Sequence, residues 1–227
     1  MIWTLDGVTA EAARLYPLKV LARPTTKPQP QFGGRHFQPE SWNSKVKQPA
    51  AWPTGSLMSS PESIIDEFRS ARYTQGLAMV ASWGTMWRNP GAIWGRHTPV
   101  TLERVLAECA RDIRKTESIE KSWHVLTGSE ASKLGWSAVA ASKTLHFLCR
   151  SIGLEQDPPV AIDNLIIRNQ VWPAFRDGIP AGSRPLGWAG NGFDAYWRYM
   201  TAILTWARMR GWTTTQVEAT IFKNFRA

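Results

Sequence analysis

Cysteine is scarce in this sequence, and long hydrophobic runs are missing. The chain of 227 residues has two cysteines, Cys109 and Cys149, which are too few for a disulfide framework or a four-thiolate metal cluster. The longest stretch without a charged residue spans 73–87 and contains two glycines, so it is too short to cross a bilayer. Asp6 precedes any apolar stretch, which argues against a secretory signal. We therefore expect a cytoplasmic protein that has no membrane segment.

Acidic residues are few relative to basic ones. The sequence has 18 Asp and Glu against 27 Lys and Arg, a formal net charge of +9. An excess of this size favours a polyanionic partner, with nucleic acid ahead of a membrane surface. Most of the 13 tryptophans are expected to fill the core, but aromatic side chains near Arg and Lys also form stacking platforms for unpaired bases. DNA is the partner we expect, and an all-α regulatory domain with incidental charge is a more distant alternative.

Proline concentrates in the first part of the chain. Segment 23–58 is basic and Pro-rich, and the prolines that interrupt regular structure are Pro24, Pro28, Pro30, Pro39, Pro49, Pro53 and Pro61. A segment of this composition is typical of an irregular arm. We therefore divide the chain into a basic N-terminal arm, 1–59, and a helical domain, 60–227. The arm is equally compatible with an ordered extension and with a DNA-contacting segment.

From Ser60 onward the patterns are helical. Ser60-Pro61 and Thr98-Pro99 each place a capping residue before a proline at the first helical position. Apolar residues at helical spacing predict further helices over 137–151 and 193–207, the second ended by Gly211. The motif from Thr215 to Glu218 predicts a capping box for a last helix. No alternating run of five or more residues argues for a strand, so the predicted fold class is all-α, without internal repeats.

The stretch 138–172 carries the candidate chemistry. Lys143 lies in the first turns of a helix that ends near Gly153, and a loop with two prolines follows. Asp163 then stands where it can cap the next helix, 164–172. On spacing alone, a solvated lysine and a helix-capping aspartate explain both residues.

The order of these features resembles the 8-oxoguanine DNA glycosylase fold of the helix-hairpin-helix DNA glycosylases. The resemblance covers roughly residues 60–226 and includes compact bacterial members, some of which excise modified bases in phage defence. It implies that Lys143 is the amine nucleophile and Asp163 the catalytic carboxylate. Only this Lys/Asp segment is specific, and the rest of the resemblance is at the level of pattern.

Other positions take roles from the same resemblance. Segment 79–88 is similar to the part of the family that fills the gap left by a flipped nucleotide, which gives Trp83 the wedge position and Arg88 the contact to the orphaned base. A buried Trp83 in a helix seam explains the pattern equally well. Phe147 occupies a family position in the base pocket, while helical spacing adds Tyr196 and Tyr199. The predicted DNA-binding set is Trp83, Arg88, Ser142 and Arg168.

Some features of the family are missing. Val139 and Ala141 stand where the family's hairpin normally has glycines, so we expect a remodelled hairpin with a weaker phosphate contact. The absence of a Cys quartet excludes the iron–sulfur branch of the superfamily. The four histidines show no metal-ligand spacing, and for His146, three residues after Lys143, a packed core position is the better interpretation. We therefore expect no cofactor and no metal.

The function that this resemblance implies is excision of a modified base from DNA. Bulky modified cytosine in phage DNA is one candidate substrate, and an abasic site is the product, with weak lyase activity as a further possibility if Lys143 attacks the sugar. The alternative is a catalytically silent DNA-binding module of the same fold. We expect the protein to act as a monomer.

Overall fold

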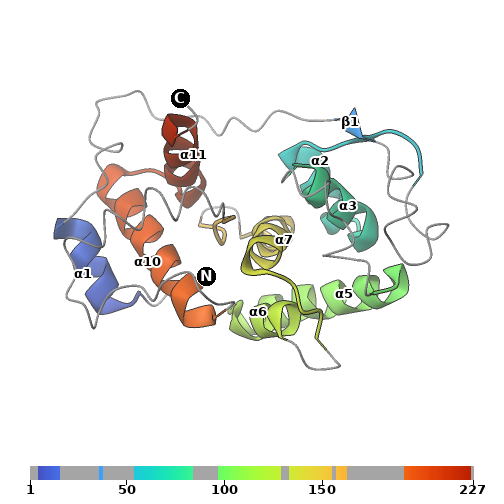
Figure 1. Ribbon diagram of the computed structural model, residues 1–227, viewed down its shortest axis with the longest axis horizontal. Helices are drawn as coiled ribbons and strands as arrows, with labels where there is room; N and C mark the ends of the chain where they lie inside the picture. The colour runs from blue at the N-terminus through green and yellow to red at the C-terminus, as the bar shows by residue number, and fades with distance from the viewer. Residues whose placement is uncertain are drawn as a thin grey trace. The chain divides into compact units, whose positions relative to one another are not determined.

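The structure is a computed structural model, and it describes residues 5–15, 36–37, 54–83, 97–128, 133–154, 157–162 and 192–225. The chain divides into two compact units, one made of Met1–Gln31 with Gln156–Ala227 and the other of Phe32–Glu155. The described residues are mostly α-helical, as the sequence predicted (Figure 1). None of the described helices is long and apolar enough to span a membrane.

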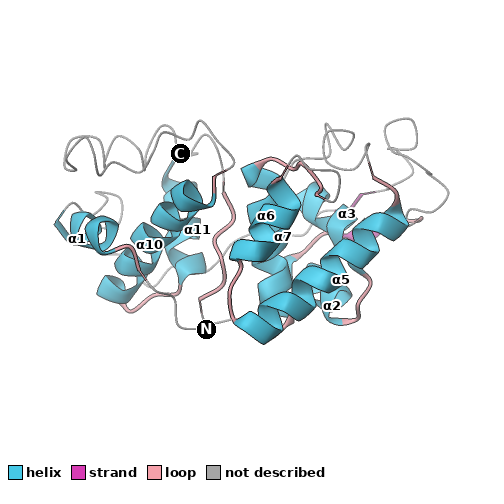
Figure 2. Ribbon diagram, turned by 90° about the horizontal axis from the view of Figure 1, so that it is seen from below, coloured by secondary structure: helices cyan, strands magenta, loops and turns pink. Residues whose placement is uncertain are grey.

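The unit Phe32–Glu155 is a helical assembly around one central helix. That helix, α7, contacts each of the other four helices that the structure describes in this unit (Figure 2). Its buried residues lie on every side, so it forms the middle of the core. The described elements of this unit are β1 (His36–Phe37), β2 (Leu57–Met58), α2 (Pro61–Arg69), α3 (Tyr73–Trp83), α5 (Pro99–Thr116), α6 (Glu120–Thr127) and α7 (Ala138–Ser151).

Local sequence sets where two of these helices begin. The Ser60 side chain accepts a hydrogen bond from the Ser63 N–H and Pro61 is the first residue of α2. The Thr98 hydroxyl likewise caps α5 by accepting from the Thr101 N–H. Both starts confirm the prediction, because a side-chain oxygen satisfies an amide that the first helical turn leaves without a partner.

Glu103 of α5 fixes the beginning of α3. Its carboxylate accepts hydrogen bonds from the Tyr73 N–H at 3.1 Å and from the Thr74 N–H at 2.7 Å. The Thr74 hydroxyl donates a third bond at 2.6 Å. A negative side chain at the N-terminus of a helix also interacts favourably with the helix dipole. This tertiary cap ties α3 to α5.

The other unit contains α1 (Gly7–Leu15), α10 (Phe193–Arg210) and α11 (Thr214–Phe225). Helix α10 contacts both of the others. The indole N–H of Trp206 donates to the carbonyl of Ala13 at 2.9 Å, so α1 is held at its C-terminal end by α10. Helix α10 ends at Gly211, whose φ of 63° is the left-handed conformation that glycine adopts without strain.

The structure departs from three sequence predictions. The compact units do not follow the predicted boundary between 59 and 60, because α1 lies in the predicted arm and packs on α10. The short antiparallel pair β1–β2 was not predicted, since two residues per strand leave no alternating pattern. The last capping box begins two residues earlier than predicted: the Gln216 N–H donates to the Thr213 hydroxyl, and the Thr213 N–H donates back to the Gln216 side chain.

Candidate functional site

Lys143 lies in the middle of the central helix and is almost fully removed from water. Helix α7 begins after Ser137, whose hydroxyl accepts from the Ala140 N–H. The Lys143 residue is only 7% exposed. Lysine is among the residues least often buried, because its charge is costly to desolvate unless it is paired. The alternative interpretation of Lys143 as a solvated helix residue therefore does not hold in this structure.

The two positions at which the glycosylase resemblance expects hairpin glycines are helical in this structure. Val139 and Ala141 both lie inside α7, in helical conformation, so neither position needs the positive φ that favours glycine. A left-handed backbone conformation occurs before the helix begins, at Gly135, where φ is +64°. The helix thus begins ahead of Lys143 without special backbone geometry at 139 or 141.

Asp163, Arg88 and Arg168 lie outside the described residues. The residues that lead directly to Asp163 are described, and Pro158 to Ile162 are buried. The Val160 carbonyl accepts from the Tyr196 hydroxyl at 3.0 Å, and the Val160 N–H donates to the Met200 sulfur at 3.0 Å. The hydroxyl of Thr214 donates to the Pro158 carbonyl at 3.1 Å. Side chains of α10 and α11 therefore hold the backbone at Pro158 and Val160.

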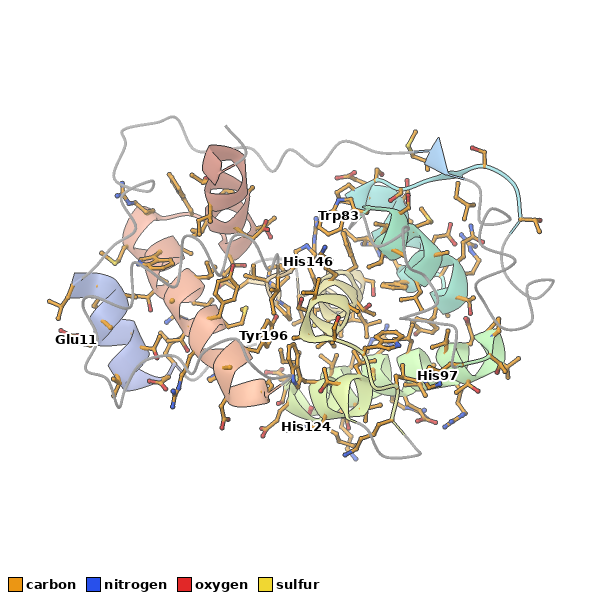
Figure 3. All side chains as sticks on the ribbon, viewed as in Figure 1. Glu11, Trp83, His97, His124, His146 and Tyr196 are labelled. Atoms are coloured by element: carbon orange, nitrogen blue, oxygen red, sulfur yellow. The ribbon has the colours of Figure 1, made fainter. Side chains whose placement is uncertain are left out.

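Trp83 and Phe147 come together in the structure. Trp83 is the last residue of α3, and its ring meets Phe147 of α7 edge-on, with centroids 4.9 Å apart. His146 contacts the same Phe147 ring at 4.9 Å, and Figure 3 shows Trp83 and His146 on these neighbouring helices. Phe147 is fully buried, whereas Trp83 is half-buried. Of these three aromatic residues, Trp83 is the one that is not classed as buried.

The predicted base-pocket residues serve as core in this structure. Phe147 and Tyr196 are 0% exposed and Tyr199 is 5% exposed. The Tyr196 hydroxyl is engaged with the Val160 carbonyl. A side chain with no accessible face cannot stack on a base in this conformation, so packing explains the helical spacing of the two tyrosines. Helical spacing alone does not distinguish a core stripe from a binding face.

Ser142 is also buried, and its hydroxyl donates to the Val139 carbonyl at 3.1 Å. Ser142 therefore exposes no group in this structure that could make the predicted contact with DNA. His146 is 6% exposed and packs against an aromatic ring, as the sequence interpretation expected. Among the described residues, no group of three or more His, Cys, Asp or Glu is placed to hold a metal ion.

Sequence analysis overlooked the groove between α5 and α6. A signal was present, since Glu108, Arg111, Asp112 and Lys115 follow one another at i, i+3, i+4 and i+7, which puts four charged residues on one helical face. Charged faces of this kind are usually solvated, and the sequence does not show that a second helix covers part of it.

Comparison with known protein families, curated proteins and solved structures finds no match to this chain.

Proposed function

We propose that the protein is a monomeric DNA glycosylase of the helix-hairpin-helix type, which extrudes a modified base and hydrolyses its glycosidic bond. The observation that carries the proposal is the burial of Lys143 on the central helix, at 7% exposure. A basic side chain removed from water in the middle of a helical core is a candidate functional residue, because pairing or catalysis must offset its desolvation. It is also the residue that the glycosylase resemblance selects.

The anchored segment before Asp163 supports the same proposal. Cleavage of a glycosidic bond builds positive charge on the sugar, and a carboxylate held in place stabilises that charge. Catalytic groups must be held by rigid surroundings, and the backbone at Val160 is fixed by Tyr196 and Met200. Asp163 comes directly after Ile162 in the sequence. It is the carboxylate that we assign to the reaction.

For Lys143 we propose a positioning role. A nucleophilic lysine would form a Schiff base with the sugar and lead to strand scission. The glycosylase resemblance ties the geometry around this lysine to hairpin glycines, and the corresponding positions, Val139 and Ala141, are ordinary helical residues here. We therefore expect the product to be an intact abasic site.

The proposal is tested by incubating the protein with duplexes that carry unmodified, oxidised or bulky modified cytosine and guanine bases, and assaying abasic sites by alkaline cleavage. The wild type should cleave only after alkali, and borohydride should trap no covalent adduct. Lys143→Met, which keeps an apolar stem of similar length, should reduce the rate at least about tenfold. Lys115→Met changes an exposed lysine of α5 and should leave the rate unchanged.

Two outcomes would overturn parts of the proposal. An adduct trapped by borohydride and lost in Lys143→Met would make Lys143 the nucleophile. Salt-sensitive DNA binding without abasic sites on any duplex would replace the enzyme with a silent DNA-binding module. Thermal unfolding of Lys143→Met shows whether a lost rate reflects a lost fold.

A further inference from the structure

Helices α1 and α10 run side by side in the same direction (Figure 1). The Asp6 N–H, just before α1, donates to the Thr201 hydroxyl at 3.2 Å, and the Trp206 indole N–H donates to the Ala13 carbonyl at 2.9 Å. The beginning of α1 thus contacts an earlier part of α10 than its end does. The C-terminal ends of both helices therefore lie at the same end of the pair. We call this surface the α1–α10 end, and it comprises Arg14, Leu15, Arg208, Met209 and Arg210.

The α1–α10 end is exposed to solvent. Arg208, Met209 and Arg210 are all exposed, whereas every residue of α10 from 199 to 207 is buried. Met209 is 50% exposed and Leu15 is 63% exposed. The last turn of α10 therefore extends beyond the core of its unit, and it presents basic and apolar side chains together.

Arg208 and Arg210 form no ion pair within the part of the chain that the structure describes. Arg69 and Arg104, which are similarly exposed, each pair with a carboxylate on their own helix, at 2.9 Å and 3.0 Å. A basic residue in the last turn of a helix interacts favourably with the helix dipole. That interaction does not occupy the N–H donors of the guanidinium group. Both groups are therefore available to an anionic partner.

Negative charge near these two arginines is limited. No acidic residue occurs in the sequence between Asp194 and Glu218, and Glu218 is only 8% exposed. Asp157 interacts electrostatically with Arg208, but its carboxylate is half-buried and accepts a hydrogen bond from the Thr214 N–H. Positive charge is thus in excess at the α1–α10 end, even though Arg14 is paired with Glu11.

The end of α5 shows a different pattern. It also carries exposed basic residues, but three acidic residues are interspersed with three basic ones over 108–117. The charges of the two kinds therefore balance there. This contrast identifies the α1–α10 end as the better surface for a polyanion.

We propose that the α1–α10 end contacts the phosphate backbone of DNA, an inference that rests on the proposed function because it takes DNA as the partner. Arginine binds phosphate oxygens with two parallel hydrogen bonds, and such contacts position a protein without reading sequence. Arg208 and Arg210 are two residues apart and project about 200° apart around the helix, so they reach two different phosphates. Leu15 and Met209 supply apolar contacts to deoxyribose. The net charge of +9 favours DNA over an acidic protein surface.

Fluorescence anisotropy with a labelled, unmodified duplex tests the contact. Arg208→Gln with Arg210→Gln removes two phosphate contacts, so affinity at about 100 mM salt should fall at least about tenfold. The slope of log affinity against log salt should become shallower by about 1.8. Leu15→Ser with Met209→Ser should weaken binding and leave the slope unchanged, because neither side chain is charged.

Arg69→Gln with Arg104→Gln is the matched control, because it removes the same charge from two exposed arginines that are paired on their own helices. It should bind the duplex like the wild type. Equal losses in the two double arginine variants, or wild-type affinity and slope in Arg208→Gln with Arg210→Gln, would overturn the proposal. Binding to phosphatidylglycerol vesicles that this variant loses, with duplex binding unchanged, would assign the surface to a membrane instead.

The result is separable from the test of the proposed function. A shallower salt slope in Arg208→Gln with Arg210→Gln, together with no base release by the wild type, would support the backbone contact and refute the glycosylase. Base release by the wild type, together with an unchanged slope in the variant, would do the reverse.

Discussion

Lys143 and Lys121 show how position on a helix decides what a lysine can do. The Lys121 side chain is 74% exposed and reaches across a groove to Asp112. Lys143 lies on the central helix and is 7% exposed. It precedes His146 and Phe147, whose rings pack against each other. The exposed lysine keeps its hydration, whereas the buried one has exchanged most of it for contacts with protein.

The sequence identified Lys143 through a resemblance, and its burial could not have been predicted from spacing. Ala141 and Ser142 precede it and Thr144 follows it, and none of these residue types indicates which side of a helix faces the core. The burial follows from the central place of α7 among four other helices, which depends on contacts far apart in the sequence. The same limit explains why helical spacing assigned Tyr196 and Tyr199 to a pocket, although both are buried.

Cys109 gives a prediction for the alkaline range. Its thiol pKa is raised by burial from 9.0 to about 11. Between these values the unfolded chain loses the thiol proton and the folded chain keeps it, so the free energy of unfolding falls as pH rises from about 9 to 11. The loss attributable to Cys109 should reach roughly 2–3 kcal/mol. Urea denaturation at pH 8, 9, 10 and 11 measures it.

Cys109→Ala is the control for this effect, because it removes the titrating group while other alkaline titrations remain. The variant should be less stable at pH 8, since it leaves a small cavity, and should lose less stability than the wild type between pH 9 and 11. Parallel pH curves for the two proteins would show that the Cys109 thiol ionises with an ordinary pKa in the folded state.

At the scale of elements, capping residues made helix starts predictable. Ser60 and Thr98 cap α2 and α5 as the sequence indicated, because a cap depends on residues within one turn. The last helix illustrates the limit, since both Thr213 and Thr215 are followed by a suitable partner three residues later. The structure uses Thr213 with Gln216. Helix α1 also has a local cap, since the Asp6 side chain accepts from the Thr9 N–H at 2.9 Å, but its packing on α10 is a long-range contact that no capping residue predicts.

Gly76 sets the distance between α2 and α3. It lies inside α3, where glycine is intrinsically less favourable than alanine. A Cβ atom added there would overlap the ring of Phe68, which is 2% exposed. We therefore expect Gly76→Ala to lower the free energy of unfolding by roughly 1–3 kcal/mol, because overpacking outweighs the gain in helix propensity.

Chemical denaturation measures this prediction, with Gln75→Ala as the matched control on the same helix. Gln75 is only partly buried and should tolerate alanine within about 0.5 kcal/mol. Gly76→Ala with wild-type or higher stability would mean that the two helices can separate without loss, and that the close approach is not a requirement of the fold.

At the scale of the whole molecule, the sequence gives the net charge directly. It does not give the division of the chain into compact units. The net charge of +9 is a property of composition and needs no structure. The division into units was not predictable in the same way, because residues 1–31 join residues 156–227 through contacts such as that of Trp206 with Ala13. A Pro-rich segment predicts irregular backbone. It does not predict that the helix before it, α1, packs on α10.

The basic charge predicts salt-sensitive binding to DNA. Lys and Arg side chains that contact phosphates release counterions, so affinity should fall steeply between about 50 mM and 200 mM salt. Fluorescence anisotropy with a labelled duplex measures the slope, and sucrose at matched osmolality should leave the affinity unchanged. Binding that is absent at low salt, or that does not change with salt, would remove nucleic acid as the partner.

The most direct measurement of the central claim is mass spectrometry of the bases released from modified DNA by the wild type and by Asp163→Asn. The carboxylate stabilises positive charge that develops on the sugar, and the amide cannot. The account predicts release of one modified base by the wild type, and no detectable release by Asp163→Asn at similar DNA affinity. Undiminished release by Asp163→Asn would contradict the glycosylase assignment.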